Sequence, residues 1–204
     1  MSISPHWPAP NHIHCKIFNS IDNIHPHRFF PPKRTFSNPH PMQARQLIQH
    51  IMTQIKPARP QLLQQTHSGR FCIIGYPRFS YLADASVTTQ KNIALAVYTA
   101  DCLPIFLTSS SGSFIAVIHA GWRGLYHNII KNTLQDIPKS AKDIMAWIGP
   151  SICKSCYEVS AQFKKDFIKK FIKYTKKIKN FSILIPNHGK FSKKNKLINN
   201  YIGE

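Results

Sequence analysis

Three short polar segments carry side chains that are able to bind a metal ion. They contain His67, Cys102 and His119, and each lies next to an apolar run. Two imidazoles and one thiolate fill three corners of a tetrahedron and leave the fourth open, which is typical of catalytic rather than structural zinc sites. These residues are therefore candidate ligands of a single zinc ion. The segments are Gln65-Thr66-His67-Ser68-Gly69, Thr99-Ala100-Asp101-Cys102-Leu103-Pro104 and His119-Ala120-Gly121-Trp122-Arg123-Gly124.

The spacing of the three residues does not by itself decide between a metal site and ordinary structural roles. Their separations of 35 and 17 residues match no local ligand motif such as His-Glu-x-x-His. Taken singly, Cys102 is also consistent with an inert buried thiol, His67 with a loop histidine, and His119 with a hydrogen-bonded histidine at a strand end. The residues alone leave both interpretations open.

Cys153 and Cys156 form a Cys-x-x-Cys pair, a spacing found in redox centres and in halves of zinc sites. The sequence offers neither a second such pair nor a His-x-x-x-His pair to complete a structural zinc site. Five cysteines are an odd number and too few for a disulfide framework, so we expect cysteines to serve as ligands or core residues. Ligand or core positions are therefore favoured over a redox pair for Cys153 and Cys156.

Apolar periodicity predicts the elements that position these residues. Apolar residues three and four apart indicate helices, and short apolar runs between turn residues indicate strands. We expect helices over Met42–Ile55 and Gly121–Gln135, and a third after an N-cap at Ser160 that buries Phe163, Phe167, Ile168, Phe171 and Ile172. We expect strands at Ile13–Phe18, Phe71–Gly75, Ile93–Tyr98, Ile105–Thr108, Phe114–Ile118 and Ile144–Ile148, with a hairpin over Ile105–Ile118. This order predicts an α+β fold, a mixed α/β sandwich in which helices pack on mixed sheets.

Length and composition predict a single domain. A chain of 204 residues with 43% apolar content buries one large core. We expect one domain over 1–204, with an irregular Pro- and His-rich segment at 1–41. The basic C-terminal segment at 180–204 is a candidate for a shortened end of the domain. The first ten residues lack the pattern of a signal peptide, and no apolar run reaches the roughly 18 residues of a membrane helix. We therefore expect a cytoplasmic protein that does not enter membranes.

The formal net charge of +19 raises the question of a nucleic-acid partner. Twelve lysines lie between positions 164 and 196, where lysines scattered around a helix indicate a solvated face. No basic-aromatic motif or groove-reading module accompanies them. We therefore expect no specific binding to nucleic acid.

Several segments resemble the signature segments of the YfiH-like laccase-domain family, also called multicopper polyphenol oxidases and generally described as purine nucleoside phosphorylases. The resemblance covers about Gln65 to Val159. Its strongest segments are those around Cys102 and His119, with Ile148-Gly149-Pro150 and Cys156-Tyr157-Glu158-Val159. Weaker ones are Trp7-Pro8-Ala9-Pro10, Gln65-Thr66-His67 and Ala83-Asp84-Ala85-Ser86-Val87-Thr88.

This resemblance implies that His67, Cys102 and His119 bind one zinc ion per chain. It also implies phosphorolysis of adenosine, inosine and methylthioadenosine, together with deamination of adenosine, so the expected partners are purine nucleosides and phosphate. Copper is a poorer expectation, because one His-Cys-His set lacks the histidine pairs that several copper ions require.

Two further residues are candidates for roles in this chemistry. The planar guanidinium of Arg123 suits a phosphate group bidentately, although a surface arginine at a helix start is an equal alternative. Asp101, next to Cys102, is a candidate to orient a ligand histidine or relay protons, and a turn-forming aspartate is the alternative.

The sequence also departs from the family. The Arg, Gly-Gly-x-Ser and Asn-Leu-Gly segments usual near the start are not recognisable between Lys16 and His40, and the usual Phe-Phe-Ser segment with paired arginines is missing near the end. Two alternative functions therefore stay open. One is a hydrolase that edits peptidoglycan precursors, and the other is a decayed, non-catalytic basic protein that binds polyanions.

Overall fold

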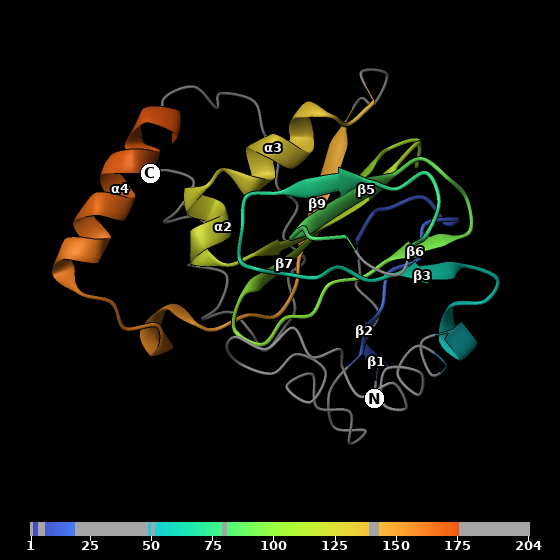
Figure 1. Ribbon diagram of the computed structural model, residues 1–204, viewed down its shortest axis with the longest axis horizontal. Helices are drawn as coiled ribbons and strands as arrows, with labels where there is room; N and C mark the ends of the chain where they lie inside the picture. Colours follow the sequence, from blue (N-terminus) through green and yellow to red (C-terminus); the bar gives the residue numbers. More distant parts are fainter. Residues whose placement is uncertain are drawn as a thin grey trace.

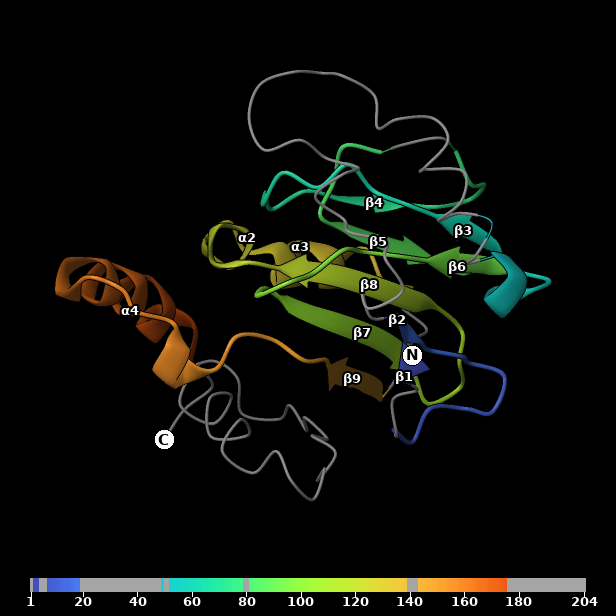
Figure 2. The same ribbon diagram turned by 90° about the horizontal axis from the view of Figure 1, so that it is seen from below.

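The computed structural model describes residues 2–3, 7–18, 49, 52–78, 81–138 and 143–175, and its centre is a five-stranded mixed sheet. The strand order is β4-β5-β8-β7-β9. β4 and β5 run parallel, and the other neighbours are antiparallel (Figures 1 and 2). The strands are β4 (Phe71–Ile73), β5 (Ala85–Thr88), β7 (Leu103–Ser109), β8 (Ile115–Ala120) and β9 (Ile144–Ile148). The predicted hairpin and the strand Ile144–Ile148 are confirmed.

Two short strand pairs lie beside this sheet. β3 (Arg59–Gln61) pairs in parallel with β6 (Ile93–Leu95), and β6 lies next to β5 (Figure 2). β1 (Ser2–Ile3) pairs antiparallel with β2 (Ile17–Phe18). The predicted strand at Ile13–Phe18 is therefore wrong for all but its last two residues. The strand predicted over Ile93–Tyr98 ends at Leu95.

The main apolar core lies on the face of the sheet that α3 (Ile129–Gln135) covers. Alternate strand residues point to one face, so the register aligns Ala85, Ile118, Ile105 and Ile148 across four strands. Ile129 packs among them and is fully buried. Burying one such side chain contributes about 1.5–3 kcal/mol, so this face anchors the strands whose ends carry the candidate site.

The single helix predicted over Gly121–Gln135 is wrong, because two helices occupy this stretch. α2 (Trp122–Tyr126) ends at His127, and α3 begins after Asn128. Asn128 has a φ of 60°, in the left-handed region that interrupts a right-handed helix and that asparagine tolerates better than most residues. The apolar period continues across the break, which is why the pattern predicts one helix.

α4 (Ala161–Thr175) lies beside α2, away from the sheet (Figures 1 and 2). Ser160 caps it as predicted, since the Phe163 N–H donates to the Ser160 Oγ over 3.2 Å. Phe163 and Phe167 contact the rings of Trp122 and Tyr126, with centroid distances of 5.0 and 6.5 Å. The predicted burial of Ile168 is wrong, because this side chain is 44% exposed. The side chain of Ile172 lies outside the described residues.

The helix predicted over Met42–Ile55 falls mainly outside the described residues, although residues 52–55 are helical. Mixed sheets with packed helices confirm the α+β prediction. Among the helices that the structure describes, none combines the length and apolar character needed to cross a membrane.

Candidate metal centre

The structure brings His67, Cys102 and His119 together at one end of the central sheet. One ligand atom from each side chain lies within 4.8 Å of the others. The two imidazole rings meet edge to face with centroids 4.7 Å apart. His119 is buried, Cys102 is half-buried and His67 is exposed, so the cluster extends from the core to the surface.

The strand register explains why Cys102 and His119 meet. β7 and β8 are antiparallel, so the start of β7 lies opposite the end of β8, with Pro104 paired to His119 and Leu103 to Ala120. Cys102 immediately precedes β7. Residues 17 apart in the sequence therefore become neighbours through a hairpin whose turn is at the far end of the sheet.

His67 reaches the cluster from the loop between β3 and β4. Its φ of 58° places it in the left-handed region, which costs a non-glycine residue about 1–2 kcal/mol. The side chain of Gln65 links this loop to the segment before Cys102, since it accepts from the Tyr98 N–H at 2.7 Å and donates to the Tyr98 carbonyl at 2.9 Å. The strained conformation of His67 is thus imposed by its surroundings.

The other side of this loop rests on the helices. The amide of Asn132 on α3 donates to the carbonyl of Gly69 at 2.8 Å and to the carbonyl of His127 at 3.1 Å. Gly69 lies so close to His127 that a side chain there would collide with its backbone oxygen. The break between α2 and α3 and the His67 loop are therefore in direct contact.

Gly121 provides the space in which the three side chains converge. A Cβ at this position would lie 2.8 Å from the Cys102 Sγ and 3.0 Å from the His67 Cδ2. Its backbone is extended, with φ −71° and ψ 164°, so the need for glycine is steric rather than conformational.

Asp84 is the functional residue that sequence reasoning missed. It is fully buried just before β5, and its Oδ1 accepts from the Nδ1 of His119 at 2.9 Å. The same carboxylate accepts the backbone N–H groups of Thr66, His67 and Ser68 at 3.2, 2.9 and 2.7 Å. The available signal was a lone acid inside the apolar stretch Ala83–Thr88, where an unpaired charge would be costly.

These contacts set the charges of the centre. Burial raises the pKa of Asp84, but hydrogen bonds from His119, Ser68 and Thr66 outweigh it and lower the pKa to about 2. Burial lowers the pKa of His119, but its hydrogen bonds to Asp84 and Cys102 and their charges raise it to about 9. Burial lowers the pKa of His67, and the nearby His119 and Arg123 lower it further against the opposing charge of Asp84. Asp84 is therefore an ionised acceptor.

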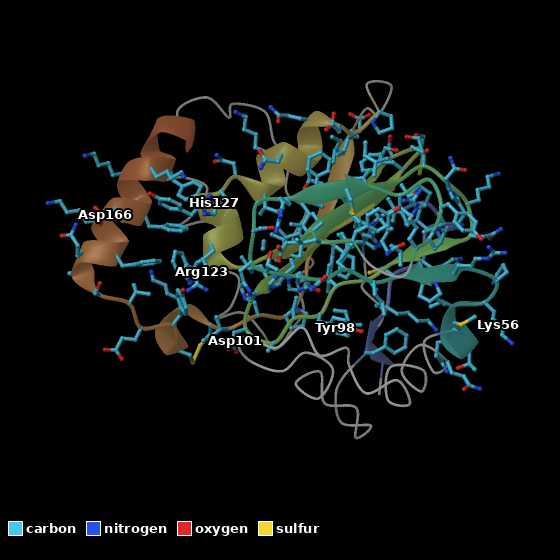
Figure 3. The ribbon with its side chains drawn as sticks, in the orientation of Figure 1. Lys56, Tyr98, Asp101, Arg123, His127 and Asp166 are labelled. Carbon is cyan, nitrogen blue, oxygen red and sulfur yellow. A yellow bond between two sulfur atoms is a disulfide. The ribbon has the colours of Figure 1, made fainter. Side chains whose placement is uncertain are left out.

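Arg123 and Asp101, both labelled in Figure 3, are not members of the metal-capable cluster of the described residues, although Asp101 adjoins Cys102 in the sequence. Arg123 is exposed on α2, two residues beyond Gly121, and its guanidinium carbon lies 4.8 Å from the centre of the Trp122 ring. Asp101 is exposed, and its backbone carbonyl accepts from the Ile152 N–H at 3.0 Å. The contact that orients a candidate ligand histidine is made by Asp84.

Cys153 and Cys156 form a disulfide on the turn η3 (Lys154–Cys156). The expectation that cysteines serve as ligands or core residues rather than in disulfides is wrong for this pair, because the turn brings positions three apart into bonding range. Cys15, Cys72 and Cys102 are free thiols. Only Cys102 belongs to the metal-capable cluster of the described residues.

The donor set fits a metal ion. The Nδ1 of His119 is engaged by Asp84, so the Nε2 of His119 is the nitrogen available to a metal ion. His67 and Cys102 supply a second imidazole and a sulfur. Three nitrogen and sulfur donors with one open position suit a tetrahedral zinc ion.

Comparison with known proteins identifies the family. The family described as multi-copper polyphenol oxidoreductase laccase matches residues 39–191. A purine nucleoside phosphorylase of Rickettsia conorii is 36% identical over 166 residues, which cover 78% of this chain and 66% of the relative. The purine nucleoside phosphorylase YfiH of Escherichia coli K12 is 34% identical over 113 residues, which cover 55% and 46%.

A similar fold is found in the crystal structure of the Neisseria meningitidis protein NMB0706. The TM-score is 0.64 at 26% sequence identity, and the match covers 84% of this chain and 70% of the other. The chain thus spans about two thirds of the length of its R. conorii relative and less than half of the E. coli one.

Proposed function

Because this chain belongs to the multi-copper polyphenol oxidoreductase laccase family, we propose that it is a zinc-dependent purine nucleoside phosphorylase that also deaminates adenosine. The observation that carries the proposal is the His67, Cys102 and His119 cluster, whose ligand atoms converge within 4.8 Å. The names of the relatives support the phosphorolytic activity. Adenosine, inosine and methylthioadenosine are the proposed nucleosides.

Zinc is the proposed metal because of the donors. A thiolate with two imidazoles is a soft and borderline set that zinc accepts in tetrahedral geometry, whereas a multicopper centre needs several histidine pairs. When bound, zinc supplies Lewis acidity at the open fourth position of the site. The exposure of His67, beside the buried His119, supports a site that substrates reach from the His67 side.

The protein's own residues are proposed to handle the phosphate. In phosphorolysis a phosphate oxygen bonds to the anomeric carbon while the bond from that carbon to the purine nitrogen breaks. Arg123 is the proposed phosphate-binding residue, because its guanidinium lies at the start of α2 and is close enough to lower the pKa of His67. The face of Trp122 supports the guanidinium and restricts its orientation.

Asp101 is proposed to hold or relay a proton at the open side of the site. Asp101 is exposed and precedes Cys102 in the chain, and its backbone carbonyl accepts the hydrogen bond from Ile152. In phosphorolysis the leaving purine takes up a proton, and in deamination the leaving ammonia does. A carboxyl group close to the reacting atoms would be suited to either transfer.

The test combines metal analysis with turnover. The purified protein should contain about one zinc per chain and cleave inosine only when phosphate is present. Cys102→Ala should lose both metal and turnover, because a thiolate ligand is removed. Full metal content in Cys102→Ala, or no turnover of any purine nucleoside by zinc-loaded wild type, would refute the proposal. Turnover of a muropeptide instead would favour the peptidoglycan-editing alternative.

Arg123→Gln tests the phosphate site separately. We expect KM for phosphate to rise about 10-fold or more while zinc content stays at the wild-type level, since a charged hydrogen-bonding partner is lost. Arg59→Gln is the matched control, because Arg59 is also exposed and also lies over an aromatic ring, that of Tyr76 on the β3 side of the molecule. An equal effect of both substitutions would exclude a specific role for Arg123.

A further inference from the structure

Asp84 contacts more of the metal centre than any other side chain described around it. Its Oδ1 accepts from the His67 N–H and from the His119 Nδ1, both at 2.9 Å. Its Oδ2 accepts from the Thr66 N–H at 3.2 Å and from the N–H and the hydroxyl of Ser68, both at 2.7 Å. Five donors thus converge on one fully buried carboxylate, and they come from both histidine-bearing segments.

The hydrogen bond to His119 decides which ring nitrogen is available to a metal. An ionised carboxylate only accepts, so the Nδ1 of His119 must carry the proton. The Nε2 is then the ring nitrogen at which a metal can bind. The backbone fixes the pair as well, because the His119 N–H donates to the Asp84 carbonyl at 2.8 Å.

The backbone contacts determine the place of His67. Three successive N–H groups from Thr66 to Ser68 point at the carboxylate, and such a turn requires the left-handed conformation that His67 adopts. Without the carboxylate, this loop would lose the contacts that offset its backbone strain.

We propose that Asp84 is a positioning residue that holds His67 and His119 in coordinating geometry before a metal arrives. The proposal deepens the proposed function and rests on its metal centre, while its test requires no nucleoside. Cys102, in contrast, is positioned by the β7–β8 hairpin. Asp84 therefore pre-organises the two nitrogen ligands, and the sheet pre-organises the sulfur.

Asp84→Asn tests the proposal at nearly constant size. The new amide has one oxygen and one NH2 group, so it cannot accept from all five donors. The less costly orientation keeps its oxygen on Thr66 and Ser68 and turns the NH2 group towards His119. A donor facing the Nδ1 favours the opposite tautomer, in which the Nε2 carries the proton and cannot coordinate.

The first measurement is zinc affinity in competition with a chromogenic chelator. Asp84→Asn should bind zinc about 10–100-fold more weakly than wild type, the range typical of lost partners of metal-bound histidines. The second is a long-range proton–nitrogen NMR correlation of the zinc-loaded proteins. Wild type should show His119 in one state, with the Nδ1 protonated and the Nε2 coordinated, and the variant should show additional states. A purely structural role would not change the coordinating nitrogen.

Ser86→Ala is the matched control. Ser86 is fully buried on β5, two residues from Asp84, and its hydroxyl has no hydrogen-bond partner among the described residues. This variant perturbs the same strand without removing a contact to the centre, so it should keep wild-type zinc affinity. Equal losses in Ser86→Ala and Asp84→Asn would overturn the proposal, as would wild-type affinity with an unchanged His119 spectrum in Asp84→Asn.

Ser68→Ala covers the case in which Asp84→Asn fails to fold. It removes one hydroxyl donor from the carboxylate on a half-buried loop. We expect zinc binding to weaken about fivefold, which is the scale of one ordinary hydrogen bond. Unchanged affinity would count against the positioning role. Tight zinc binding by wild type without any nucleoside turnover would instead refute the proposed function and leave the role of Asp84 intact.

Discussion

Replacing Gly121 with alanine should weaken metal binding without unfolding the protein. The added Cβ would lie 2.8 Å from the Cys102 Sγ and 3.0 Å from the His67 Cδ2, where ordinary contacts begin at 3.4 Å. The sulfur would therefore move by about 0.6 Å, which exceeds the roughly 0.2 Å tolerance of metal–ligand distances. We expect zinc affinity to fall by about 10–100-fold, or roughly 1.4–2.8 kcal/mol.

The assay for Gly121→Ala is chelator competition, with unfolding of the metal-free protein measured in parallel. The extended backbone at Gly121 accepts alanine, so the free energy of unfolding should fall by less than about 1 kcal/mol. Gly75→Ala is the control, because a Cβ there meets nothing within 4 Å. Wild-type zinc affinity in Gly121→Ala would refute the convergence of Cys102 and His67 on which the metal centre depends.

Three other outcomes are expected. At pH 8, iodoacetamide should modify metal-free Cys102 first, because burial raises the pKa of Cys15 to about 12 and of Cys72 to about 11. Zinc should protect Cys102 from this reaction. Peptide mass spectrometry measures the rates, and equal rates at the three cysteines would contradict the prediction. Asn128→Ala should lower the free energy of unfolding in urea by about 1 kcal/mol because of its left-handed φ, and Asn128→Gly should not. Ser160→Ala should speed amide hydrogen exchange in the first turn of α4, because the N-cap hydrogen bond is lost, and it should leave zinc affinity unchanged. Unchanged exchange would show that Ser160 does not cap the helix.

Local pattern was sufficient for the strands that form the site. Ile144–Ile148 and the hairpin of β7 and β8 are apolar runs between turn residues, and such runs form strands wherever a sheet can bury them. The hairpin also accounts for the proximity of Cys102 and His119. Residue type made His67 a candidate ligand, but its spacing left the role open until the family resemblance, because its loop joins the cluster through tertiary contacts.

Other features were beyond local pattern for identifiable reasons. The break at Asn128 leaves the apolar period intact, so periodicity does not detect it. Ile168 lies on the helical stripe but is exposed, because the aromatic contacts of α4 with α2 are made by Phe163 and Phe167. In the sequence, Asp84 is a single acid in an apolar stretch. Its place in the metal centre depends on hydrogen-bond donors that lie 16 to 35 residues away in the chain.

The contact of Asn132 with the His67 loop extends the metal centre into the helices. One amide group joins the carbonyl of Gly69, two residues from His67, to the carbonyl of His127 at the junction of α2 and α3. A small rotation of α3 would therefore pull directly on a candidate ligand, with no need for the sheet to deform. The place of His67 is therefore linked to the junction of α2 and α3, where His127 is exposed.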